Sequence, residues 1–296
     1  MDITAYTPRL PQPGETLFGH SFITVPGGKG ANQAVAAARL GAPTKMTGRV
    51  GDDGFGEEVL RAITANGVDM QAVAIDAEHD TALAMIAVDD TAQNAIIVIS
   101  GANMALDDSD VQRCLPHLDQ AHVLLLQLEV PLEANLAVAR AAQDRNVKVI
   151  LDPAPATALP AEMYALADVI TPSEIEAAML LGYEVTPLNA LAAARELCDR
   201  GADAAIVKLG ERGVFYFSEA GEGTQASFEV EAVDTVAAGD AFNGGLAVAL
   251  AEGRSFPEAV RWASASGAIA VTRPGAAPAM PHRHEVEALL ARAEKK

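Results

Sequence analysis

The sequence predicts an α/β protein with a doubly wound, mainly parallel sheet, helices on both of its faces and a small separate β-sheet. Three observations lead to this class. Short apolar runs alternate with helical stretches through most of the chain. Two consecutive strand-like segments, 81–88 and 94–100, have no helix between them and should pair antiparallel. Half of the 296 residues are hydrophobic, which is enough for a sizeable core.

The alternation of strands and helices begins near Gln33. Residues 31–40 predict a close-packing, alanine-rich helix, 45–50 a strand, and 55–66 an amphipathic helix that Gly67 ends. The nearly all-apolar run 122–128 is typical of a strand buried on both faces. The other predicted strands are 147–152, 168–171 and 204–209, and the other predicted helices are 132–145, 173–181, 242–251 and 257–271, the last two closing the chain.

The small second sheet is predicted from the segments that break this alternation. Segments 81–88 and 94–100, joined by residues 89–93, would combine with strands from 3–6 and 15–25. Such a sheet beside an α/β body can act as a lid over a site at the strand ends. We therefore expect one domain, 1–296, with lid strands drawn from about 3–25 and 81–100.

Charge and cysteine content limit the expected partners. The net charge is −19, with only six lysines, and such a surface repels nucleic acid and anionic membranes. A well-solvated surface or a salt-rich habitat would each account for this charge. Cys114 and Cys198 lie far apart, which argues against a disulfide framework or a structural zinc site. No membrane-spanning run and no signal-peptide pattern occurs, so we expect a cytoplasmic location.

The first motif is GGKGANQ, at residues 27–33, which leads into a predicted helix. Its three glycines allow a ligand to approach the backbone closely. Lys29 and Asn32 supply hydrogen-bond donors, and the start of the helix presents free N–H groups. The motif is neither the P-loop nor the dinucleotide fingerprint. A glycine turn before a helix, without a ligand, is the alternative interpretation.

The second and sharper motif is DTVAAGDAFNG, at residues 234–244. Gly239 permits a tight entry into a helix, and the N–H groups of Ala237 to Asp240 can converge on an anion. A carboxylate at that place, Asp240, can accept a proton from an attacking hydroxyl while the N–H groups hold a phosphoryl group. The alternative is that Asp240 only caps the helix.

Two weaker signals follow predicted buried strands. The segment KLGERG, residues 208–213, would hold a nucleotide base or phosphate, although a plain β-turn into 214–218 fits equally well. Glu129 comes directly after a strand, where ligands of α/β proteins bind. A loop carboxylate without a ligand is the alternative for Glu129.

In combination, these motifs resemble the ribokinase-like (PfkB) family of carbohydrate kinases, over essentially the whole chain. The resemblance is supported by PQPGETL at Pro11, GDDGFGE at Gly51, SGANMAL at Ser100, QLEVPLE at Gln127, LDPAPA at Leu151 and TRPGAAPAMP at Thr272. It implies an enzyme that transfers the γ-phosphate of ATP to a sugar hydroxyl, with the 5-hydroxyl of D-ribose as the expected acceptor.

Several alternatives to this activity remain open. Another kinase of the family would act on fructose, a ketodeoxy sugar acid or a nucleoside. A catalytically impaired sugar-binding or nucleotide-binding protein would have lost turnover, although the retention of Asp240 and its glycine turn argues against it. A dinucleotide oxidoreductase on a similar fold is disfavoured because the Gly-x-Gly-x-x-Gly fingerprint is absent after an early strand.

The resemblance implies roles for individual residues. Asp240 would be the catalytic base, with Ala237, Ala238 and Gly239 forming the anion hole. The expected sugar-binding residues are Asp2, Gly28, Lys29, Gly30, Ala31, Asn32, Glu129 and Asp240. The expected ATP-binding residues are Ser173, Lys208, Leu209, Gly210, Glu211, Arg212, Gly213, Gly239, Asp240 and Ser264.

The family also implies Mg²⁺ with ATP, an activating K⁺ and a homodimer formed through the lid. Glu176 lies in the segment TPSEIE, which resembles the family's Asn-x-x-Glu motif and would influence Mg²⁺ indirectly. The K⁺ positions, which would mostly contribute backbone carbonyls, match Asp234, Val236, Ala270, Arg273, Gly275 and Ala279.

The sequence departs from the family pattern at four places. Ser173 replaces an Asn, so a shorter side chain must reach the nucleotide; Ala241 replaces a Thr, and Ala279 replaces a Ser of the cation loop. The fourth departure is that only Met1 and Asp2 remain of an initial buried strand. We predict a natural start roughly ten residues upstream, about one strand with its lead-in, without which the parallel sheet would expose edge groups and core.

Overall fold

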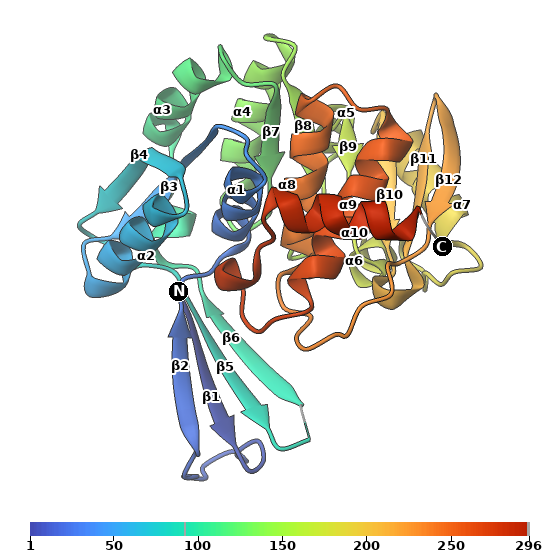
Figure 1. Ribbon diagram of the computed structural model, residues 1–296. Helices are drawn as coiled ribbons and strands as arrows, with labels where there is room; N and C mark the ends of the chain where they lie inside the picture. The colour runs from blue at the N-terminus through green and yellow to red at the C-terminus, as the bar shows by residue number, and fades with distance from the viewer. Residues whose placement is uncertain (92, 295–296) are drawn as a thin grey trace.

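The computed structural model describes residues 1–91 and 93–294, and it shows an α/β body from which a separate sheet extends (Figure 1). The larger sheet of the body has six strands in the order β12-β11-β10-β9-β8-β7. Strands β7 to β10 run parallel, whereas β11 and β12 are antiparallel additions. The six strands are β7 (Val123–Leu126), β8 (Lys148–Leu151), β9 (Val169–Ile170), β10 (Ala204–Lys208), β11 (Val214–Ser218) and β12 (Gly221–Gln225).

Two further parallel strands form a sheet of their own. These are β3 (Thr44–Gly51) and β4 (Val68–Asp76), and α2 (Gly54–Ala65) connects them. The parallel strands of the body therefore fall into two sheets. The predicted α/β class, with a mainly parallel sheet, is confirmed.

Helices cover both faces of the six-stranded sheet, because successive side chains of a buried strand point to opposite sides. On β8, Val149 and Leu151 pack against one group of helices and Ile150 against the other. One face is covered by α3 (Asp108–Leu118), α4 (Leu132–Gln143), α5 (Ala161–Ala165), α6 (Glu174–Leu181) and α7 (Ala190–Asp199). The other is covered by α1 (Lys29–Arg39), α8 (Ala238–Ala251), α9 (Phe256–Ala270) and α10 (Arg283–Ala293).

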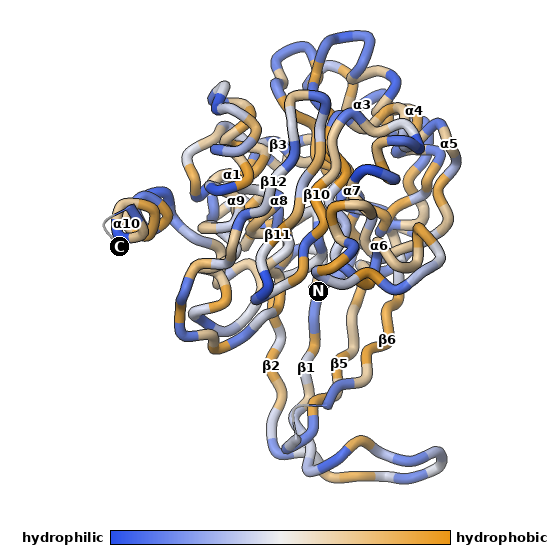
Figure 2. The backbone as a smooth tube through the Cα atoms, turned by 90° about the vertical axis from the view of Figure 1, so that its right-hand side faces the viewer, coloured by the Kyte–Doolittle hydropathy of each residue, from blue (hydrophilic) through white to orange (hydrophobic). Residues whose placement is uncertain are grey.

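The small sheet has the strand order β2-β1-β5-β6 and is called the lid sheet below. Its strands are β1 (Asp2–Thr7), β2 (Ser21–Val25), β5 (Leu83–Asp89) and β6 (Asn94–Ile99). Strands β5 and β6 pair antiparallel, as predicted, and β1 lies between β2 and β5. Apolar residues predominate along the projecting strands β5 and β6 (Figure 2). Within the predicted connection 89–93, Ala92 lies outside the described residues.

Two strand predictions were wrong in extent. Of the predicted strand 15–25, only Ser21–Val25 forms. Glu15, the first predicted residue, lies instead in a turn, in which its N–H donates to the Gln12 carbonyl at 3.0 Å. The run 122–128 forms a strand only over Val123–Leu126, and most of it is half-buried rather than buried on both faces. The reason is its position, since β7 is an edge strand of the six-stranded sheet.

One helix prediction was wrong in where the helix begins, and another was wrong only in its place in the chain. The helix expected at 242–251 begins earlier, at Ala238, because Ala237 adopts the left-handed conformation that starts it. The helix expected at 257–271 does not close the chain, since α10 follows it. None of the helices in the described residues is long and apolar enough to cross a membrane. Both cysteines of the chain are unpaired.

Candidate active site

The candidate active site centres on the start of α8. Ala237 precedes this helix with φ 58° and ψ 13°, a left-handed conformation that alanine adopts rarely and at some cost. No side chain caps the helix at that position, so the interpretation of Asp240 as a simple helix cap is wrong. Asp240 instead lies inside the first turn, and its carboxylate is buried.

The first turn of α8 leaves donors for an anion. The Ala238 N–H donates to the Thr235 carbonyl at 3.3 Å, and the Ala241 N–H donates to the Ala237 carbonyl at 2.9 Å. Among the described residues, no acceptor within the protein is found for the N–H groups of Gly239 and Asp240. Free N–H groups at the positive end of a helix attract phosphate oxygens.

Two amide side chains from α1 hold the Asp240 carboxylate. Asn32 Nδ2 donates to Asp240 Oδ2 at 2.9 Å, and Gln33 Nε2 donates to Oδ1 at 3.1 Å. Burial raises the pKa of Asp240 to about 6; the charge of Asp152 adds to this rise, whereas Lys29 and the two amides oppose it. A carboxylate with a pKa just below neutrality is suited to accept a proton from a hydroxyl.

Close packing of α1 on α8 brings these groups together. A Cβ atom on Gly244 of α8 would lie 2.5 Å from Ala36 Cβ and 2.8 Å from the Gln33 backbone carbonyl oxygen of α1. Only a glycine fits such an approach, and the alanine-rich sequence of α1 keeps its own face small. The helices therefore approach closely where Asn32 and Gln33 meet Asp240.

The predicted sugar-binding residues gather at the start of α1. Gly28 is the N-terminal cap of this helix with φ 96°, and the Lys29 N–H donates to Glu129 Oε2 at 2.9 Å. A Cβ atom on Gly27 would lie 2.1 Å from Asp2 Oδ2, so Asp2 reaches this loop from the base of β1. Burial raises the pKa of Asp2 and of Glu129.

Two side chains at the start of α1, Asn32 and Lys29, are suited to bind a polar ligand. Among the described residues, the buried Oδ1 of Asn32 has no hydrogen-bond partner, and such an atom is a ready acceptor for a ligand hydroxyl. The pKa of Lys29 is raised: burial opposes its charge, but the carboxylates of Asp240, Asp152 and Glu129 outweigh burial. Gly30 and Ala31 lie in the first turn of α1, where the Ala31 side chain is buried in the core.

The sequence analysis did not single out three residues of the site, which are Gln33, Gln127 and Asp152. Gln33 Nε2 also donates to Asp152 Oδ2 at 2.9 Å, and Gln127 Nε2 donates to Gln33 Oε1 at 2.6 Å. Lys208 Nζ lies 3.0 Å from Asp152 Oδ1. Gln127 directly follows β7, and Asp152 directly follows β8. The end of a parallel strand is therefore a signal that could have identified both residues.

The predicted nucleotide loop is a tight turn between β10 and β11. It contains one short 3₁₀ turn, η2 (Gly210–Arg212), with φ 58° at Gly210 and 82° at Gly213. The Leu209 side chain is buried in the core, so only its backbone can meet a ligand. The side chain of Arg212 pairs with Glu174, and the Glu211 carbonyl accepts a hydrogen bond from Ser227.

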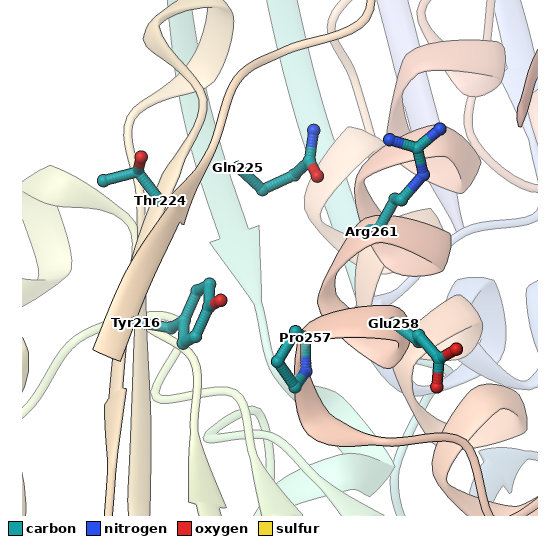
Figure 3. A pocket seen from close by; sticks show the side chains of 6 residues that line it. All are labelled: Tyr216, Thr224, Gln225, Pro257, Glu258 and Arg261. Atoms are coloured by element: carbon teal, nitrogen blue, oxygen red, sulfur yellow. The ribbon is translucent and has the colours of Figure 1, made fainter. Parts of the chain in front are cut away.

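The other predicted nucleotide residues lie on α6 and α9. Ser173 and Glu176 form a capping box at the start of α6, in which the Ser173 N–H donates to Glu176 Oε2 at 2.7 Å. Ser264 Oγ donates to the Val260 carbonyl within α9. One turn earlier, α9 borders a pocket of about 210 Å³ against β11 and β12 (Figure 3). Its lining residues are Tyr216, Thr224, Gln225, Pro257, Glu258 and Arg261.

Asp234 ties together the two segments predicted to hold K⁺. Its Oδ1 accepts from the Val236 N–H at 3.0 Å, and its Oδ2 accepts from the Gly275 N–H at 2.9 Å. Backbone carbonyls of such loops are suitable ligands for K⁺. The Arg273 side chain pairs with Glu285 at 2.8 Å, and Ala279 is buried in a short turn. Among the described residues, no cluster of three or more His, Cys, Asp or Glu side chains could hold a metal.

A buried carboxylate beside free N–H groups at a helix start, at the carboxyl edge of a parallel sheet, defines an enzyme that transfers a phosphoryl group to a hydroxyl. The model of the family described as "pfkB family carbohydrate kinase" matches residues 1–283. The chain therefore belongs to the PfkB family of carbohydrate kinases.

The relatives of the chain include ribokinases. The ribokinase of Haemophilus influenzae is 41% identical over 279 residues, which are 94% of this chain and 91% of that protein. The crystal structure of a ribokinase from Thermotoga maritima is 37% identical, with a TM-score of 0.89 over 98% of this chain and 96% of that chain. The Arabidopsis thaliana ribokinase complexed with ribose and ATP is 34% identical, with a TM-score of 0.90 over 98% and 95% of the two chains.

Proposed function

We propose that this protein transfers the γ-phosphoryl group of ATP to the 5-hydroxyl of D-ribose. The observation that carries the proposal is the buried Asp240 carboxylate, held by Asn32 and Gln33 beside the free N–H groups of α8. Its pKa of about 6 leaves it ionised at neutral pH, ready to accept a proton. The family and the ribose and ATP of the Arabidopsis complex support the two substrates.

In the proposed reaction, the sugar lies between Asp2, Glu129, Asn32 and Asp240. Asp240 accepts the proton of the attacking hydroxyl, and the oxygen attacks the γ-phosphorus in line while the bond from this phosphorus to the β,γ-bridging oxygen breaks and ADP leaves. The N–H groups of Gly239 and Asp240 hold the oxygens of the transferring group, where negative charge is concentrated. Lys29, which lies among the site carboxylates, balances the charge at the sugar end.

Two cations fit the proposed reaction. Mg²⁺ bound with ATP would shield the phosphate charges. Glu176, which caps α6 next to Ser173, would affect that region only through its contacts. The loops joined by Asp234 would hold K⁺ through the carbonyls of Val236, Ala270, Arg273 and Gly275, close to the turn that carries the anion hole. We also place the enzyme in the cytoplasm, where its two cysteines would stay reduced.

A coupled assay of ADP release tests this function. The sugars are D-ribose, 2-deoxyribose, fructose, a 2-keto-3-deoxy sugar acid and adenosine, each with K⁺ or with tetramethylammonium in its place. We expect turnover with ribose, and less of it without K⁺. Turnover with another of these substrates in place of ribose would indicate a kinase of the same family with a different substrate. Ribose binding by calorimetry without any turnover would contradict the kinase proposal and favour a sugar-binding protein.

We further propose a homodimer through the lid sheet. Strand β6 is the edge of that sheet, and its apolar side chains are unusually exposed, among them Ile97 at 63% and Val98 at 64%. A long, apolar, exposed edge strand is normally covered by a partner.

The substitution Ile97→Asp is expected to convert the dimer to a 30.7 kDa monomer in light-scattering chromatography, because a charge cannot be buried there without a partner. Leu188→Asp, at an exposed position of the body, should leave the mass unchanged. A wild-type protein that is monomeric at micromolar concentration would contradict the proposed dimer.

A further inference from the structure

A continuous chain of polar side chains joins Asp240 to Lys208 across the site. Gln33 Nε2 donates to Asp240 Oδ1 at 3.1 Å and to Asp152 Oδ2 at 2.9 Å, and Lys208 Nζ contacts Asp152 Oδ1 at 3.0 Å. The side chains of Asp152 and Lys208 are only 3% and 13% exposed. A buried ion pair of this kind requires good geometry and further hydrogen bonds, and Gln33 supplies one.

The amide of Gln33 has a single possible orientation in this chain. Its Oε1 accepts a hydrogen bond from Gln127 Nε2 at 2.6 Å, so its nitrogen must face the two carboxylates. An amide nitrogen carries two hydrogens, and here one is available for each carboxylate. Gln127 is in turn anchored, because its backbone carbonyl accepts a hydrogen bond from Asn135 at 2.7 Å. Gln33 is therefore a fixed bridge between Asp152 and Asp240.

The two bridged carboxylates differ in their charged neighbours. Asp152 contacts the ammonium group of Lys208 directly. Asp240 instead accepts hydrogen bonds from two side-chain amides, and the charge of Lys29 acts on it only by longer-range electrostatic attraction. The negative charges of Glu129 and Glu176 also act on Lys29 and raise its pKa. Lys208 also lies close to the start of α8, since a Cβ atom on Gly239 would be 3.5 Å from its Nζ.

We propose that Gln33 and Asp152 are positioning residues that hold the Asp240 carboxylate towards the acceptor hydroxyl, and that Lys208 serves as the counter-ion of Asp152. The role proposed for Lys208 differs from its expected role in a nucleotide-binding loop. The proposal depends on the proposed function in one respect, which is that Asp240 accepts the proton of the acceptor hydroxyl. In this arrangement the charge on Asp152 affects catalysis through Asp240, without contact with either substrate.

The test is a double-mutant cycle with Asp152→Asn and Lys208→Met, read out as the pH dependence of kcat. Removing the negative charge of Asp152 should lower the pKa of Asp240 and move the acidic limb to lower pH. Lys208→Met leaves Asp152 without its counter-ion, which should raise the pKa of Asp240 and move the limb to higher pH. The double variant should return towards the wild type, because both charges are gone together.

Gln33→Met tests the bridge itself. Methionine keeps the length of the side chain but cannot hold the carboxylate, so we expect kcat to fall roughly 10- to 100-fold, as for a catalytic group that is slightly misplaced. The affinity for ribose should change little. Gln143→Met, at an exposed glutamine of α4, is the matched control and should behave as the wild type. Melting temperatures and ribose calorimetry establish that each variant is folded.

The outcomes separate this inference from the proposed function. If the wild type prefers another sugar, the cycle is run with that sugar, and only the proposed substrate fails. If the wild type turns over no sugar, the carboxyl carbon resonance of Asp240 is titrated by NMR, and the same opposite shifts are expected. Shifts of the two single variants in the same direction would overturn the inference. So would a double variant as impaired as Lys208→Met, because Lys208 would then act on the nucleotide directly.

Discussion

Asp240→Ala is expected to lower kcat by roughly 10²- to 10⁴-fold, the usual contribution of a positioned general base. Asp240 is the only carboxylate in the described residues that touches both Asn32 and Gln33 and lies in the first turn of α8. Ribose should still bind, because Asp2, Glu129 and Asn32 remain. Steady-state ADP release measures the loss, and calorimetry measures the binding of ribose.

Asp119→Ala is the control for this change. Asp119 forms an exposed ion pair with Arg145 at 2.8 Å, and its loss should leave turnover within a factor of two, since exposed pairs contribute little. An Asp240→Ala variant that keeps a fifth or more of the wild-type kcat would exclude Asp240 as the base.

The same variant also has an expected effect on stability. The pKa of Asp240 is raised to about 6 in the folded protein, above about 3.9 in an unfolded chain. The folded protein therefore binds a proton at the Asp240 carboxyl more tightly than the unfolded chain does. The stability that this protonation contributes to the folded state is lost as the pH rises from about 4 to 6. Relative to Asp240→Ala, the wild type should lose roughly 2 kcal/mol of unfolding free energy between pH 4 and 7. Urea unfolding at several pH values measures the difference.

Gly244→Ala is the second large expected effect, and it acts on packing. The added Cβ would meet Ala36 Cβ at 2.5 Å and the Gln33 backbone carbonyl at 2.8 Å, so α1 and α8 must separate. We expect a loss of about 2–3 kcal/mol from this overpacking, which exceeds the gain of up to about 1 kcal/mol from replacing glycine in a helix. Turnover should fall as well, because Gln33 moves away from Asp240.

Gly54→Ala is the matched control for Gly244→Ala. Gly54 is the first residue of α2, and a Cβ atom there meets no atom within 4 Å. The control should melt at or slightly above the wild-type temperature. Thermal unfolding of both variants measures the contrast, and equal melting temperatures would show that the two helices can separate at no cost.

The sequence motifs predicted the two helix starts around which the candidate site is built, but not the side-chain contacts between them. Glycines before two helices and a carboxylate in the second motif were readable, because helix starts and tight turns have local signatures. The bridge from Asp240 through Gln33 to Asp152 links residues separated by 207 and 119 positions. Such contacts depend on how α1, α8 and β8 pack, which no local pattern specifies.

The errors in secondary structure have similar causes. The start of α8 was missed because Ala237 adopts a left-handed conformation that alanine does not signal. The burial of β7 was overestimated because an apolar run does not reveal whether its strand lies at the centre or the edge of a sheet. The predictions of an upstream start and of a single domain remain predictions.

The scarcity of lysine has a practical consequence for labelling. The sequence has six lysines, and among the four in the described residues, Lys29 and Lys208 lie in the site. The other two, Lys45 and Lys148, are 48% and 54% exposed on the body. Lys208 is shielded by its ion pair, at 13% exposure, so an amine-reactive dye should modify the surface lysines first. Attachment to a sensor chip through amines should therefore leave Lys208 unmodified.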